Sequence, residues 1–104
     1  IVHVVAMARR AGIALGMDRF DAISREVPVI ANITPSGQYL MEDFYYAGGL
    51  PALMTRLTGH LHLGATTVTG RPLSESLVGA EVHNDDVIRT VENPIYAEGA
   101  LAVL

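Results

Sequence analysis

The sequence contains no cysteine and no tryptophan, and it has few charged residues. Without cysteine these residues offer no disulfide framework, no thiolate nucleophile and no cysteine ligand for zinc or an iron–sulfur cluster. Basic charge is scarce as well: all seven basic residues are arginines, spread from Arg9 to Arg89, and the net charge is −4. A scattered, acidic charge distribution of this kind argues against nucleic acid as a partner.

Long hydrophobic runs are also missing. The longest apolar stretches, at 4–8 and 27–31, are far shorter than the roughly 18 residues that a membrane-spanning helix needs. The first residues show no signal-peptide pattern. We therefore expect a soluble, cytoplasmic protein with no membrane partner.

The 104 residues do contain ample material for a core. Half of them are hydrophobic, 17% are charged and the mean hydropathy is +0.33, which predicts one compact unit rather than a disordered chain. The chain opens on Ile1, already within an apolar helical pattern and with no cap before it. This opening predicts an internal fragment of a longer protein.

The first third of the sequence predicts two helices. Apolar residues recur at spacings of three and four over 1–11, and Gly12 follows as a stop signal. A second helix is predicted over 19–26, with Asp18 as its N-cap and Pro28 as its end.

A buried strand is predicted next, over 27–33, because this run is apolar, rich in β-branched residues and does not alternate. We expect it to be buried on both faces, with Ile30 inside. Turn residues follow at 34–37, and helices are predicted over 39–46 and 51–60.

The remaining elements are short. We predict a β-type run at 66–69, one or two helical turns at 74–78 that end at Gly79, and further β-type runs at 87–91 and 100–104. Helices and strands alternate up to Gly79, and short β-type runs separated by turn residues follow. This change predicts a domain boundary near 79–86. Residues after Asp86 are expected to be poorly packed, and to be mobile or to associate, unless a partner covers their edges.

Histidines are the first candidates for chemistry. His60 and His62 alternate, so on a strand they would share one face as zinc ligands often do, but no third ligand is near and a surface or helix-end role is favoured. His3 could reach a pocket from its helix, although a satisfied or exposed side chain is the commoner case. His83 precedes the polar run 84–86, which could be a metal loop but is more typical of a solvated turn.

Other candidates are acidic or rich in glycine. Glu42 and Asp43 could supply a general acid, yet neighbours on a helix point about 100° apart, and a role at the helix N-terminus is favoured. Gly48–Gly49 and 66–70 could bring backbone close to an anion. Tight turns between packed elements explain both equally well. These residues thus indicate an α/β protein without naming a reaction.

Three strings carry a resemblance to a known family. They are PSGQYLMEDFYYAGGLPA at 35–52, TVTG at 67–70 and NPIY at 93–96. Together they resemble the dihydroxy-acid dehydratase/phosphogluconate dehydratase (IlvD/Edd) family. The first residues look like that family's helix after its Gly-Gly-Ser-Thr-Asn segment, and 98–104 resembles the approach to its C-terminal domain. The forms at 43–49 and 93–99 look most like the sugar-acid branch, the pentonate (arabinonate or xylonate) dehydratases.

The resemblance implies an α/β fold: residues 1–79 would be the end of the family's N-terminal α/β domain, and 80–104 a linker and the first strands of its β-barrel-like C-terminal domain. It also implies a cytoplasmic hydro-lyase that assembles as a dimer or tetramer and acts on a small sugar acid. That enzyme would use an iron–sulfur cluster, of the two-iron or four-iron type, and Mg²⁺. In the family reaction a serine removes the C2 proton, the cluster iron assists departure of the C3 hydroxyl, and the enol product becomes a 2-keto-3-deoxy acid.

No catalytic, cofactor-binding or metal residue is carried over to this chain. The family's cluster cysteines, magnesium ligands and catalytic serine fall outside the matching strings, so the fragment alone is expected to be inactive. Two alternatives remain open. One is the dihydroxy-acid dehydratase of branched-chain amino-acid biosynthesis, and the other is a non-catalytic assembly module of the same fold.

Overall fold

A computed structural model describes residues 1–99 and 101 of the chain. The chain divides into two compact units, so the prediction of one compact unit was wrong. The first unit comprises Ile1–Pro28 and Tyr96–Leu104, and the second comprises Val29–Ile95. Among the described residues, none of the helices combines the length and the apolar character needed to cross a membrane.

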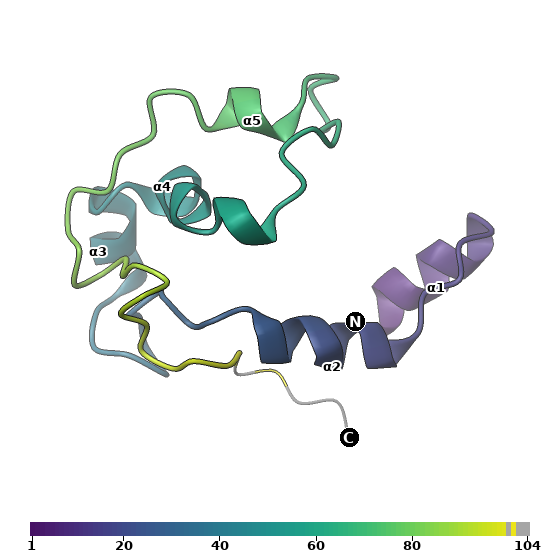
Figure 1. Cartoon of the computed structure of the whole chain (residues 1–104), viewed down its shortest axis with the longest axis horizontal. Helices are drawn as coiled ribbons and strands as arrows, with labels where there is room; N and C mark the ends of the chain where they lie inside the picture. The colour runs from purple at the N-terminus through teal and green to yellow at the C-terminus, as the bar shows by residue number, and fades with distance from the viewer. Residues whose placement is uncertain (100, 102–104) are drawn as a thin grey trace. The chain divides into compact units, whose positions relative to one another are not determined.

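Helix α1 (Val2–Arg10) opens the first unit (Figure 1). It ends at Arg10, one residue before the predicted end, and the predicted stop signal Gly12 adopts φ +77°. The Ile13 N–H donates to the Ala8 carbonyl at 2.8 Å and the Gly12 N–H donates to the Arg9 carbonyl at 3.0 Å. These two bonds satisfy carbonyls that the helix end would leave open, and only glycine adopts the required backbone conformation without strain.

Helix α2 (Met17–Glu26) begins two residues earlier than the pattern predicts. Its N-cap is Gly16, and Asp18 lies in the first turn, where a carboxylate is favourable beside the free N–H groups. The predicted N-cap was therefore wrong, but the predicted end was right. Val27 is extended, as the residue before Pro28 must be.

The last described segment of the first unit lies along the end of α2. The Gly99 N–H donates to the Ser24 carbonyl at 2.5 Å, and the Ser24 hydroxyl donates to the Leu101 carbonyl at 2.7 Å. A Cβ atom built on Gly99 would lie 2.6 Å from both oxygens of Ser24. Glycine is thus required for this close approach. Of the predicted run 100–104, only Leu101 is among the described residues.

The second unit contains the remaining helices. These are α3 (Met41–Tyr46), α4 (Gly49–Arg56), the 3₁₀ turn η1 (Thr58–His60) and α5 (Leu73–Ser76). Helices α3 and α4 adjoin one another (Figure 1). The Asp43 carboxylate accepts the Leu40 N–H at 2.8 Å and so caps α3. The predicted helix over 51–60 begins earlier, at Gly49, and breaks after Arg56.

The predicted strand over 27–33 is wrong in form and partly right in burial. This segment makes isolated β-bridges instead of a strand, among them Ala31 with Ile88 and Ile33 with Tyr39. Ile30 is buried, as expected, but the second buried side chain of the segment is the polar Asn32. Buried positions alternate, so the segment is not buried on both faces. It forms no extended ladder because each neighbouring segment turns away after one pair.

The core of the second unit lies where α3 and α4 meet residues that follow Asp86. It contains Ala47, Ala52, Val87 and Ile88, with Phe44, Leu53 and Val82 packed against it. The prediction that residues after Asp86 pack poorly was wrong for Val87 and Ile88, which are at most 1% exposed. They enter the core from a turn, so the predicted strand at 87–91 is reduced to one bridge at Ile88. The run at 66–69 likewise pairs once, Thr66 with Pro72.

The described residues therefore combine short helices with a few single bridges, joined by turns and irregular segments. One backbone hydrogen bond joins the two ends of the second unit: the Ile95 N–H donates to the Val29 carbonyl at 2.8 Å. This architecture is consistent with part of an N-terminal α/β domain.

Candidate functional site

A small cavity in the second unit brings together polar residues from two distant parts of the sequence. Its volume is about 240 Å³. The lining consists of Tyr39, Asp43, Tyr46, Ala47, His83, Asn84 and Val87, and we refer to it as the Tyr39 cavity. Helix α3 and the segment before it supply one wall, and the turn at 83–87 supplies the other. The cavity is smaller than the roughly 300 Å³ at which drug-sized pockets begin.

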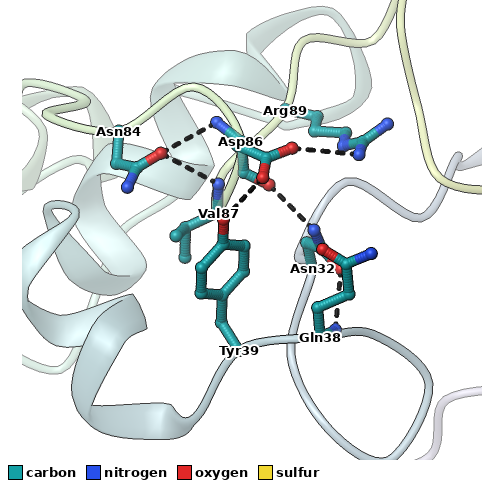
Figure 2. A network of polar contacts seen from close by, with 7 residues as sticks. All are labelled: Asn32, Gln38, Tyr39, Asn84, Asp86, Val87 and Arg89. Atoms are coloured by element: carbon teal, nitrogen blue, oxygen red, sulfur yellow. Dashed lines mark hydrogen bonds and ion pairs between the residues drawn. The ribbon is translucent and has the colours of Figure 1, made fainter.

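A carboxylate behind the cavity ties these two walls together (Figure 2). Asp86 accepts a hydrogen bond from the Tyr39 hydroxyl at 2.6 Å through Oδ2, and an ion-paired hydrogen bond from Arg89 Nη2 at 3.0 Å through Oδ1. Contacts of this charge-assisted type are short and directional. Tyr39 is thereby held against the turn that contains Asp86.

Side-chain amides fix the same turn. Asn84 Oδ1 accepts the backbone N–H groups of Asp86 at 3.0 Å and of Val87 at 3.4 Å, which is the pattern of an Asx turn. The Asn32 Nδ2 donates to the Asp86 carbonyl at 3.1 Å. Figure 2 shows how these bonds converge on Asp86 from both sides.

The hydrogen bond to Asp86 also determines the ionisation of the tyrosine. Asp86 raises the pKa of Tyr39 above its ordinary value, first because it accepts a hydrogen bond from the neutral phenol and then because its carboxylate repels the phenolate. Tyr39 therefore serves as a neutral hydrogen-bond donor near neutral pH.

The cavity unites two of the residues singled out in the sequence, Asp43 and His83. One Asp43 oxygen caps α3, as expected for a carboxylate at a helix start. The backbone N–H of His83 donates to the Ala47 carbonyl at 2.8 Å. Phenol, carboxylate, imidazole and amide groups can together bind a small polar molecule. The cavity offers no activated nucleophile, and the part of the chain that the structure describes contains no group of three histidines or carboxylates able to hold a metal ion.

The other candidate histidines are not brought together. His3 lies exposed on α1, His60 ends the 3₁₀ turn, and His62 follows it in an irregular segment rather than on a strand. The shared strand face that a zinc pair needs is therefore absent at residues 60–62.

Both glycine-containing candidates are tight turns. Gly48 adopts φ +127°, and a Cβ atom there would collide with the Glu81 carbonyl oxygen and with Ala52. A carbonyl at that distance would repel an anion. In the second candidate, the Thr67 N–H donates to the Arg71 carbonyl at 2.8 Å and the Gly70 N–H donates to the Thr67 carbonyl at 2.9 Å, so both donors are used within the turn.

Sequence reasoning placed Asp86 in a polar turn but missed its partners, Tyr39 and Arg89. Arg89 lies three residues after Asp86, a spacing that permits an ion pair. No pattern in the sequence pairs Tyr39 with a residue 47 positions later.

Comparison with known proteins shows that most of the chain matches a domain of a known enzyme family. The family model described as Dihydroxy-acid/6-phosphogluconate dehydratase N-terminal matches residues 1–76. This match covers most of the chain, which therefore belongs to the dihydroxy-acid/6-phosphogluconate dehydratase family. The resemblance stated from the sequence strings is confirmed.

Three relatives illustrate the range of the family. The chain is 43% identical over 105 residues to the 6-deoxy-6-sulfo-D-gluconate dehydratase of Pseudomonas putida. It is 42% identical over 106 residues both to the L-arabinonate dehydratase of Rhizobium leguminosarum bv. trifolii and to the dihydroxy-acid dehydratase of Caldanaerobacter subterraneus. These alignments cover 99 to 100% of this chain but only 18 to 19% of each relative. The chain thus spans under a fifth of the curated relatives that it matches.

Proposed function

We propose that the chain is part of a hydro-lyase that dehydrates a sugar acid, a pentonate, to its 2-keto-3-deoxy acid. The single observation that supports this best is the family match over residues 1–76. The preference for a pentonate rests on the forms at 43–49 and 93–99 and on the likeness to an L-arabinonate dehydratase.

The proposed reaction removes one water molecule. A base takes the C2 proton, the C3 hydroxyl leaves, and the resulting enol tautomerises to the keto acid. Hydroxide is a poor leaving group, so the reaction needs a Lewis acid. We propose an iron–sulfur cluster and Mg²⁺ for the complete enzyme.

The residues of this chain do not fit either group. There is no cysteine to hold a cluster, and the described residues include no carboxylate and histidine group suited to a metal ion. The ligands and the catalytic serine would therefore come from outside these 104 residues. The chain's own contribution would be structural, with 1–79 completing the N-terminal α/β domain and 80–104 leading into the C-terminal one.

The partners and location proposed for the complete enzyme follow from the same reasoning. It would bind a small-molecule acid and no nucleic acid or membrane. It would form a homodimer or homotetramer in the cytoplasm.

A second candidate is dihydroxy-acid dehydration in branched-chain amino-acid synthesis. A dihydroxy-acid dehydratase is as similar to this chain as the L-arabinonate enzyme, at 42% identity each. The third candidate is a non-catalytic assembly module of the same fold.

Substrate assays on the complete protein that contains this sequence would separate the three. The purified protein, with iron, sulfide and Mg²⁺ supplied, is tested with arabinonate, xylonate and a branched 2,3-dihydroxy acid, and keto-acid formation is measured. Turnover of a pentonate supports the proposal, turnover of the branched acid alone supports the second candidate, and no turnover of any acid supports the module. The 104-residue chain treated in the same way should show no cluster absorbance, and a stoichiometric cluster on it would contradict the proposal.

A further inference from the structure

The family match and the folded unit end at different residues. The family model matches residues 1–76, whereas the second unit continues to Ile95. The segment between these ends, 77–95, begins with an exposed turn in which Gly79 adopts φ +77° and Val78 is 82% exposed. Domain boundaries commonly fall in exposed, glycine-containing segments of this kind. The contacts of the residues that follow the turn therefore decide whether 77–95 belongs to the matched domain.

Residues 81–83 lie against the junction of α3 and α4. The backbone N–H of His83 donates to the carbonyl of Ala47, which directly follows α3, at 2.8 Å. The Glu81 carbonyl approaches Gly48 so closely that a Cβ atom there would collide with it. Val82, between these two residues, packs against the core of the unit. Three consecutive residues of the segment thus contact the second unit, to which the matched part contributes α3 and α4.

The next residues complete the core at α3 and α4. Its buried members are Ala47, Ala52, Val87 and Ile88. The two members from the matched part are alanines, whose side chains are single methyl groups, so Val87 and Ile88 supply the larger share of buried apolar side chain. Burial of apolar surface is the main favourable contribution to the stability of a domain. The core of the matched part is therefore incomplete without the segment 77–95.

Backbone hydrogen bonds attach the same segment to residues 29–33. The Arg89 N–H donates to the Ile30 carbonyl and the Ile95 N–H donates to the Val29 carbonyl, both at 2.8 Å. Ile30 is 2% exposed, and a buried carbonyl that loses its partner is costly. Val29 and Ile95 are also the first and last residues of the unit. The chain therefore leaves the unit beside the point where it enters, as the ends of a complete domain often do.

We infer that residues 77–95 belong to the N-terminal dehydratase domain, and that the polypeptide crosses to the rest of the enzyme after Ile95. This inference rests on the two-domain arrangement proposed above and moves its division from residue 79 to residue 95. A flexible linker makes few contacts with the domain that it leaves, whereas 77–95 contributes two of the four buried residues of this core. The segment is a fixed part of the domain rather than a free tether.

Hydrogen exchange on the complete dehydratase tests the inference, with Leu53→Ala as the perturbation. Leu53 lies on α4, inside the family match, and packs against the core. Leu50→Ala is the matched control, because it makes the same change on the same helix at a side chain that is 60% exposed. Exchange is measured by mass spectrometry in peptides that cover 40–48 and 81–95, and in reference peptides from the polypeptide beyond residue 104. No substrate is present, so the result does not depend on which acid, if any, the enzyme dehydrates.

We expect Leu53→Ala to accelerate exchange at least about tenfold in both peptides, by the same factor, and to leave the reference peptides unchanged. Leu50→Ala should change none of them. If the Leu53→Ala variant does not fold, Leu53→Val makes a smaller deletion and permits the same comparison. Acceleration confined to 40–48, or a peptide 81–95 that follows the reference peptides instead, would overturn the inference. Unchanged exchange in both peptides would overturn it too, as would equal acceleration in all peptides, because no boundary would then lie after Ile95.

Discussion

Truncating Ile88 should open the core of the second unit. Ile88 is 0% exposed and packs among Ala47, Ala52 and Val87. Ile88→Ala removes three carbons worth roughly 0.8 kcal/mol each, and the cavity left behind adds to that, since such substitutions cost about 2 to 5 kcal/mol. A loss of about 3 kcal/mol is therefore expected. This is a large part of the stability of a unit of this size, at about 0.1 kcal/mol per residue.

Two backbone amides report on this core directly. The Asn32 N–H donates to the Val87 carbonyl and the Arg89 N–H donates to the Ile30 carbonyl, both at 2.8 Å. Both bonds lie beside Ile88 in the chain and break when the segments separate. A destabilisation of about 3 kcal/mol should accelerate hydrogen exchange at these amides roughly 100-fold, at 1.36 kcal/mol for each factor of ten.

The assay is hydrogen exchange by mass spectrometry or NMR on the complete protein, with Val68→Ala as the control. Val68 is fully exposed, and surface substitutions usually change stability by less than about 0.5 kcal/mol. Unchanged exchange at Asn32 and Arg89 in the Ile88→Ala variant would refute the view that residues after Asp86 form the core.

Three further substitutions probe the same unit. Asp86→Asn should lower the pKa of Tyr39 toward its ordinary value, as measured by phenolate absorbance. In the unsubstituted protein the raised pKa belongs to the folded state, so the Tyr39–Asp86 hydrogen bond stabilises the fold fully below about pH 10. This stabilisation is lost as the pH rises through the folded-state pKa. Gly48→Ala should lower the free energy of unfolding by roughly 1 to 3 kcal/mol, because the added Cβ would meet the Glu81 carbonyl. The urea midpoint should fall accordingly, and an unchanged midpoint would contradict the crowding at this position. Ile30→Asp should cost several kcal/mol by burying an unpaired charge, and a variant with normal thermal stability would show that Ile30 is exposed.

The helices could be predicted because their signals are local. Gly12 and Pro28 mark the ends of α1 and α2 through backbone conformations that a few neighbouring residues determine. The start of α2 was predicted at the wrong residue because Gly16 and Asp18 are both acceptable near a helix N-terminus. Local chemistry alone could not choose between them.

The strand prediction failed because pairing depends on distant residues. The run at 27–33 has strand composition, but a ladder needs a neighbour that stays alongside. The neighbour here, the segment around Ile88, comes out of an Asx turn and makes one pair with Ala31. The same turn carries Val87 and Ile88 into the core, which the sequence alone had suggested would be uncovered.

Asn32 links neighbouring segments through hydrogen bonds of both its backbone and its side chain. The Asn32 backbone donates to the Val87 carbonyl at 2.8 Å and accepts from the Tyr39 N–H at 3.0 Å. Its side chain donates to the Asp86 carbonyl at 3.1 Å and accepts from the Gln38 N–H at 2.9 Å. Asn32 is 3% exposed, so four hydrogen bonds satisfy a polar residue that would otherwise be costly to bury.

This arrangement explains why the sequence reveals a family without revealing a catalytic residue. Within the string that carries the resemblance, Tyr39 binds Asp86, Asp43 caps α3 and Gly48 permits close contact with the backbone of Glu81. Each of these three roles is structural and joins or begins elements of the second unit. The resemblance therefore rests, at these positions, on residues that shape the domain, and we propose that the rest of the polypeptide supplies the chemistry of the proposed reaction.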